Sequence, residues 1–182
     1  MWVRIGDLPT ESTFLQRVRH QELSAVSSEE LVKKLNTLKA SVWDPHSLRW
    51  HFSGHGSQVG ATTETEYARL AEAVLNNPTR IFSEIYVDPR TINQYGLSRL
   101  LPSEREDRIK EVVTNLTRSW VFVDEWTGRV VVVSDTGSIL TLYAHTVPQG
   151  IATFIRNRLL SEGVEIIGSE ANDGDQDAQS TE

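Results

Sequence analysis

The chain has 182 residues, of which 38% are hydrophobic and 24% charged, a composition typical of a globular protein with enough chain to bury a core. It has no cysteine, which excludes disulfides, thiolate zinc sites and cysteine nucleophiles. No apolar run approaches the roughly 20 residues that span a bilayer. The N-terminus also lacks the pattern of a secretory signal, so we expect a cytoplasmic protein without a membrane partner.

The net charge of −7 is unevenly distributed along the chain. Residues 168–182 carry five of the 25 acidic residues and no basic residue, so the rest of the chain is nearly neutral. The composition of this segment predicts a disordered acidic tail. A nearly neutral body can present a local basic face, so the charge does not exclude a nucleic acid as partner.

Residues 1–45 predict an N-terminal helical segment. A weak helical pattern covers residues 11–23. Ser27 and Glu30 then have the spacing of a capping box, and apolar residues follow at helical spacing up to Leu38. Pro45 and the residues after it interrupt this pattern.

The middle of the chain predicts two further helices and a strand. Thr63 and Glu66 form a second capping box ahead of an apolar stripe that ends at Asn77 and Pro78. Residues 80–87 are rich in β-branched and aromatic side chains and predict a strand. Residues 88–102 show no regular pattern, and Ser103 with Glu106 marks a helix through about residue 116.

The clearest strand pattern lies in the C-terminal third. Residues 120–123, 129–133 and 138–143 are separated by turns at Gly128 and Gly137, which predicts an antiparallel meander. A helix over about residues 148–161 has one apolar side that would cover a face of this sheet. The expected fold class is therefore α+β, with N-terminal helices followed by an antiparallel β-meander packed against helices.

Two histidines, His51 and His55, lie four residues apart, beside Gly54 and Gly56 and ahead of a capped helix. Histidine exchanges protons near physiological pH, and glycine lets the backbone approach a ligand closely. A zinc site is the weaker alternative, because Phe52 stands where a metalloprotease has its glutamate. His51, between two aromatic residues, also fits a buried core histidine.

The order of these motifs resembles the nuclease toxins that share the barnase, EndoU, colicin and RelE fold. In that family a histidine-glycine motif leads into a helix, and a later meander carries a Thr-x-Tyr or Thr-x-Phe signature. The resemblance covers about residues 49–146, and we assign residues 46–167 to a domain of this kind. The matching positions are His51, Phe52, His55, Gly56, Gly60, Thr63, Glu66, Tyr67, Ala71, Val130 to Val133, Asp135, Gly137, Ile139, Thr141 and Tyr143.

The resemblance implies metal-independent RNA cleavage that needs no cofactor. A base takes the proton of a ribose 2′-hydroxyl, the oxygen attacks the adjacent phosphorus, and an acid protonates the leaving 5′-oxygen, giving a 2′,3′-cyclic phosphate. On the matched positions, His55 is the acid or base and His51 its partner or orienting group. Thr141 and Tyr143 are assigned to phosphate binding or proton transfer.

Further substrate-binding residues are expected near these positions. The family has a lysine where this chain has Gly54, and Arg80 or Arg129 is the candidate replacement. His145 follows Tyr143 by two residues and would lie on the same face of a continuing strand, as a second proton-transfer group. As alternatives, Arg80 and Arg129 fit ordinary surface charges, and a β-strand also favours threonine and tyrosine for packing.

The expected partners are RNA, with transfer RNA as one candidate, and a cognate inhibitor or immunity protein of a toxin, including a phage-associated toxin. The second hypothesis is a binding or interaction protein that keeps the fold with weak or no catalysis. The acidic net charge and the missing lysine favour that alternative.

Overall fold

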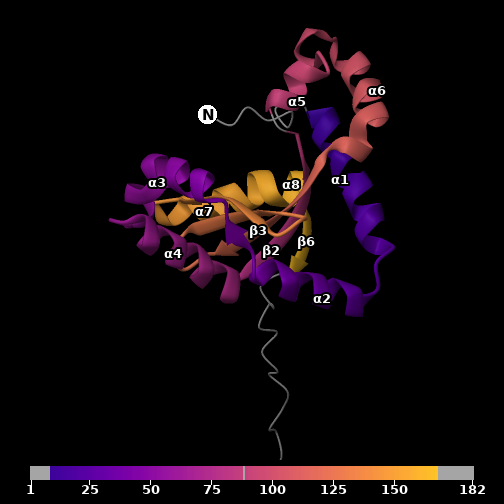
Figure 1. The fold of residues 1–182 in the computed structure, drawn as a ribbon. Helices are drawn as coiled ribbons and strands as arrows, with labels where there is room; N and C mark the ends of the chain where they lie inside the picture. The colour runs from indigo at the N-terminus through magenta and orange to yellow at the C-terminus, as the bar shows by residue number, and fades with distance from the viewer. Residues whose placement is uncertain (1–8, 88, 168–182) are drawn as a thin grey trace, which may run out of the picture.

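The computed structural model describes residues 9–87 and 89–167, which form a six-stranded sheet with helices on both faces (Figure 1). The predicted α+β class is confirmed. The strand order is β1-β5-β4-β3-β2-β6, and β1 runs parallel to β5 while the other neighbours are antiparallel. The strands are β1 (Val42–Trp43), β2 (Arg80–Tyr86), β3 (Thr117–Asp124), β4 (Arg129–Ser134), β5 (Ser138–Ala144) and β6 (Val164–Ile167). The helices are α1 (Pro9–Ser24), α2 (Ser28–Lys39), α3 (Pro45–Val59), α4 (Glu64–Asn76), α5 (Pro89–Gln94), η2 (Leu97–Arg99), α6 (Pro102–Val112), η3 (Val113–Asn115), α7 (Pro148–Phe154), η4 (Ile155–Leu159) and α8 (Leu160–Glu162).

The N-terminal helices pack on the same sheet as the rest of the chain. Ser27 caps α2 with the predicted capping box, because its hydroxyl accepts from the Glu30 N–H while the Glu30 carboxylate accepts from the Ser27 N–H. Leu38 of α2 is fully buried in the main core, which is the hydrophobic cluster between the sheet and helices α2 and α4. Leu15 of α1 packs in a second cluster with Ile85 of β2. The predicted acidic tail, residues 168–182, lies outside the described residues.

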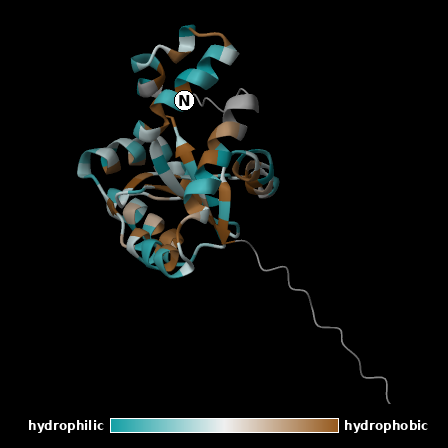
Figure 2. Ribbon diagram, turned by 90° about the vertical axis from the view of Figure 1, so that its right-hand side faces the viewer, coloured by the Kyte–Doolittle hydropathy of each residue, from teal (hydrophilic) through white to brown (hydrophobic). Residues whose placement is uncertain are grey.

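The predicted meander is confirmed as β3, β4 and β5, with Gly128 and Gly137 at positive φ in its two turns. The meander has hydrophobic clusters on both faces, one beneath α2 and α4 and one beneath α7 and η4. Figure 2 shows hydrophobic residues on the strands and hydrophilic residues over much of the outer helices. This explains why the strand at residues 129–134 is apolar on both sides.

The expectation that the residues after Pro45 interrupt the helical pattern is wrong, because helix α3 begins at Pro45 and runs through the whole histidine-glycine motif. Asp44 caps the helix by accepting from the N–H groups of His46 and Ser47, both at 3.0 Å, and Pro45 occupies the first turn. Phe52 packs against the main core and supports the helix despite its two glycines. The helix ends at Gly60, whose φ of 81° suits a glycine.

Other boundaries also differ from the sequence patterns. The segment expected to be irregular, residues 88–102, contains α5 and η2, and β1 lies within the region expected to be helical. Helix α6 begins at Pro102 rather than at Ser103, since the Glu104 carboxylate accepts from the Leu101 N–H, and it ends at Val112. Thr63 caps α4 as predicted. The Glu66 carboxylate, however, accepts from the N–H and the hydroxyl of Thr62, so the reciprocal half of the predicted capping box is made one residue earlier. Figure 1 shows α5 and α6 projecting beyond the sheet beside α1.

The predicted helix at residues 148–161 covers one sheet face as expected, but it is not a uniform α-helix. It starts as α7, continues through the π-helical turn η4 and ends in the short α8. Ile151, Ile155 and Leu159 are its buried residues and pack on β2, β3 and β4. β6 then adds an edge strand beside β2. Within the described residues, no helix combines the length and the apolar character needed to cross a bilayer.

Candidate active site

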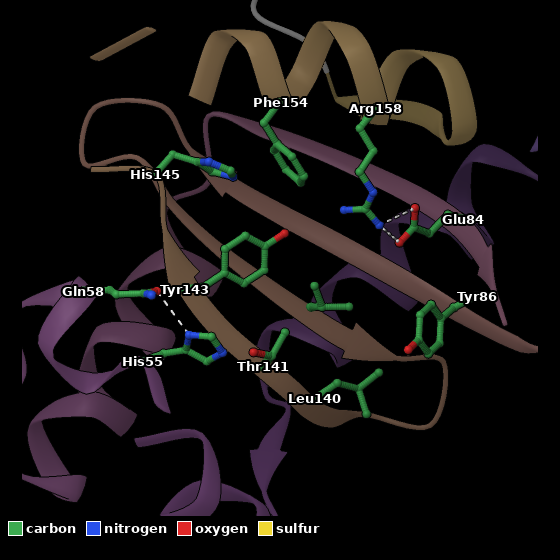
Figure 3. Close-up of a pocket in the computed structure, with 11 residues that line it drawn as sticks. His55, Gln58, Glu84, Tyr86, Leu140, Thr141, Tyr143, His145, Phe154 and Arg158 are labelled. Carbon is green, nitrogen blue, oxygen red and sulfur yellow. Dashed lines mark hydrogen bonds and ion pairs between the residues drawn. The ribbon is translucent and has the colours of Figure 1, made fainter. Parts of the chain in front are cut away.

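A pocket of about 440 Å³ lies between the sheet and the helix formed by α7 and η4 (Figure 3). Helix α3 closes one side of it, and β2 and β5 supply much of its floor. Its walls are mainly apolar, with a few polar groups among them. The lining residues are His55, Gln58, Glu84, Tyr86, Val132, Leu140, Thr141, Tyr143, His145, Phe154 and Arg158.

Helix α3 brings His55 to the pocket and keeps His51 out of it. The two residues lie one helical turn apart, so their rings stack with centroids 6.0 Å apart. His55 Nδ1 lies 3.1 Å from Gln58 Oε1, and this hydrogen bond orients the imidazole at the pocket wall. His51 is only 5% exposed and packs against Trp43 and Trp50.

The environment of His51 holds its imidazole neutral. Burial, and secondarily the nearby charge of His55, lowers the pKa of His51 from 6.5 to about 4. At neutral pH a histidine with this pKa is the neutral imidazole, which is a poor proton donor. His51 is therefore suited to support the His55 ring by packing, which agrees with its predicted role as an orienting group more than with proton transfer.

Strand β5 directs Thr141 and Tyr143 into the pocket. Thr141 pairs with Val132 of β4, whereas Ile139 pairs with Val133, so Leu140 is an extra residue in a β-bulge. Thr141 is buried, and its hydroxyl makes no hydrogen bond to any residue that the structure describes. The Tyr143 ring lies between His55 of α3 and Phe154 of α7, with its centroid 6.3 Å from that of His55.

His145 follows β5 and faces the same pocket, as predicted from its position relative to Tyr143. Its backbone N–H donates to the Gly128 carbonyl at 2.9 Å, which fixes the chain beyond the strand. The imidazole lies between Tyr143 and Phe154, at ring-centroid distances of 5.7 and 4.5 Å. Burial lowers the pKa of His145 below 6.5, and its Nε2 has no hydrogen-bond partner in the described part of the chain.

The two arginines proposed to replace the lysine do not line this pocket. Arg80 lies at the far end of β2, where its guanidinium binds the Glu165 carboxylate at 2.6 Å and lies 3.9 Å from Glu125. Arg129 donates to the Val59 carbonyl at the end of α3, at 3.0 Å. Both arginines are engaged in these contacts and neither lines the pocket of His55, so their expected role in substrate binding stays a prediction.

The pocket contains a charged pair that the sequence motifs did not predict. Glu84 of β2 and Arg158 of η4 meet beneath the helix, with Arg158 Nη2 donating to the two carboxylate oxygens at 2.8 and 3.2 Å. A glutamate in the middle of an apolar strand predicts a buried ion pair, since a buried carboxylate requires a partner. Its partner, Arg158, lies 74 residues further along the chain, so local sequence patterns do not identify the pair.

Comparison with protein-family models, with curated proteins and with solved structures finds no match to this chain. Its function is therefore inferred from the pocket and from the chemistry of the residues around it.

Proposed function

We propose that the protein is a metal-independent endoribonuclease that cleaves RNA by attack of the ribose 2′-hydroxyl, giving a 2′,3′-cyclic phosphate and a free 5′-hydroxyl. The observation that most supports this proposal is the convergence of His55 and His145 on opposite sides of Tyr143 in one pocket. Two imidazoles around a single cavity suit a reaction that needs one base and one acid.

The burial of His145 suggests how the two roles divide. Because its pKa is lowered, the His145 imidazole is neutral at neutral pH and can accept the proton of the 2′-hydroxyl. His55 then donates the proton that the leaving 5′-oxygen takes up as its bond to phosphorus breaks. The hydroxyl of Thr141, without a partner among the described residues, is available to a phosphate oxygen.

Tyr143 separates the two histidines and is the natural contact for the ribose or the phosphate between them. Its ring packs edge-on against Phe154 at 6.1 Å, so the helix at the top of the pocket fixes its orientation. His51 supports His55 from within α3. RNA, with transfer RNA as the first candidate, and a cognate inhibitor protein are the partners that belong to this proposal.

The test is cleavage of total transfer RNA by the purified protein in EDTA, with analysis of the fragment ends. His55→Ala and His145→Ala should each abolish the cyclic-phosphate ends. His46→Ala is the matched control, since His46 is exposed at the start of the same helix and away from the pocket. Cleavage that survives both pocket variants would refute the assignment.

The second candidate is a binding protein with little or no catalysis. It is favoured by the mainly apolar pocket walls and by the Glu84 carboxylate, which neutralises the pocket's arginine. Intact RNA after prolonged incubation, together with ligand-dependent thermal stabilisation of the protein, would support this candidate over the ribonuclease.

A further inference from the structure

Arg158 is a buried cation with hydrogen-bonding capacity left over. Its side chain is 12% exposed, and Nη2 is used by Glu84. Nε lies 3.7 Å from a Glu162 carboxylate oxygen, which is an ion-pair distance but too long for a hydrogen bond. Nη1 makes no hydrogen bond to any residue in the ranges that the structure describes. Buried donors without acceptors are costly and rare, so their position calls for an explanation.

The spare donor lies at a pocket that contains two other polar groups without hydrogen-bond partners among the described residues. Thr141 Oγ1 and His145 Nε2 also lack hydrogen-bond partners among the described residues, and all three side chains line the same cavity. Figure 3 shows Arg158 descending from the helix toward the floor, with its guanidinium beyond Phe154. A ligand with several acceptor oxygens would satisfy the guanidinium and the hydroxyl together.

We propose that Arg158 binds the phosphate of the scissile phosphodiester and that Glu84 is the positioning residue that holds the guanidinium. This inference rests on the proposed function. Arginine presents a planar set of N–H donors that matches phosphate oxygens and keeps its charge at every physiological pH. Arg158 thereby supplies the cation that neither Arg80 nor Arg129 brings to the pocket.

The carboxylate partner determines how Arg158 acts. Glu84 accepts from one edge of the guanidinium and leaves Nη1 for the ligand, so the arginine works through directed donors more than through net charge. Glu84→Gln keeps an acceptor and removes a negative charge near the phosphate. This variant should bind a phosphodiester two- to ten-fold more tightly, roughly as expected for one nearby charge, and should have a lower kcat because the guanidinium is held less firmly. Wild-type affinity together with wild-type kcat would remove Glu84 from the proposal.

The main experiment measures binding of a 2′-deoxy tetranucleotide, which has phosphodiesters but no nucleophile, by calorimetric titration. Arg158→Gln should weaken binding about ten-fold or more, as expected for loss of a charge-assisted hydrogen bond. Arg156→Gln is the matched control, because Arg156 is exposed on the same helical turn and its loss changes the net charge equally. It should change the affinity less than two-fold.

A second variant guards against misfolding. Arg158→Gln alone leaves the Glu84 carboxylate buried without its main partner, so the double variant Arg158→Gln with Glu84→Gln is also measured, because two amides can hydrogen-bond as a neutral pair. A folded double variant that still loses binding supports the proposal. A folded double variant that binds like Arg156→Gln overturns it.

Parallel RNA cleavage separates this inference from the proposed function. Cleavage of RNA with tetranucleotide binding that is indifferent to residue 158 would overturn the role of Arg158 and leave the ribonuclease intact. Binding that depends on Arg158 without any RNA cleavage would support the phosphate site and refute the ribonuclease.

Discussion

The buried, neutral state of His51 predicts a pH dependence of stability. In the folded protein burial lowers the pKa of this imidazole to about 4, whereas in the unfolded chain it returns to about 6.5. Between these pH values the unfolded state binds more protons, so the free energy of unfolding falls as the pH decreases. The loss attributable to His51 is negligible at pH 8, about 2 kcal/mol at pH 5 and about 3 kcal/mol at pH 4.

Urea unfolding followed by tryptophan fluorescence at pH 8, 6.5 and 5 measures this effect against His51→Phe. Phenylalanine keeps an aromatic ring beside Trp43 and Trp50 and cannot titrate. Costs of the substitution that do not depend on pH cancel when the two pH profiles are subtracted, as do the carboxylates common to both proteins. The variant should lose about 2 kcal/mol less than the wild type between pH 8 and pH 5. Profiles that run parallel within about 0.5 kcal/mol would refute the buried neutral histidine.

Three further predictions concern the motif helix, the helix cap and the pocket. A Cβ at Gly56 would lie 2.7 Å from the Phe52 ring, so Gly56→Ala should lower the free energy of unfolding by about 1–3 kcal/mol, whereas Gly54→Ala meets nothing within 4 Å and should raise it by up to about 1 kcal/mol. Equal effects in urea unfolding would contradict this packing. Ser27→Ala should destabilise the protein by about 1 kcal/mol through loss of the cap of α2, seen as a lower urea midpoint. The pH profile of kcat/KM for RNA should have an acidic limb centred below 6.5, because a base with the lowered pKa of His145 becomes active as the pH rises through that value; a limb above 6.5 would exclude His145 as the base.

The meander and the capped helices were predictable because their signals are local. Glycine turns between β-branched runs and the Ser27 capping box depend on residues a few positions apart. Helix α3 was missed because aromatic residues and two glycines obscure its pattern, while its stability comes from packing against a core that forms at a distance. Asp44 followed by Pro45 was the local signal that could have located its start.

The site was predictable to the extent that its residues belong to motifs. His55, Thr141, Tyr143 and His145 were all selected from the sequence, and the structure brings them to one pocket. Arg80 and Arg129 were chosen as the cation although neither lines the pocket, because arginines are common and a sequence does not show which of them a carboxylate holds in place. The pairing of Arg158 with Glu84 depends on how helix η4 packs above β2. This is a tertiary contact, which local sequence patterns do not predict.

The bulge at Leu140 sets the phase of alternation along β5. Side chains in a regular strand alternate between faces, so Thr141 and Tyr143 would share the face of Ile139, which is buried in the core beneath α2 and α4. The extra residue reverses the phase at mid-strand and turns both polar side chains to the opposite face. The pocket therefore depends on the bulge in β5 as well as on the identity of the residues that line it.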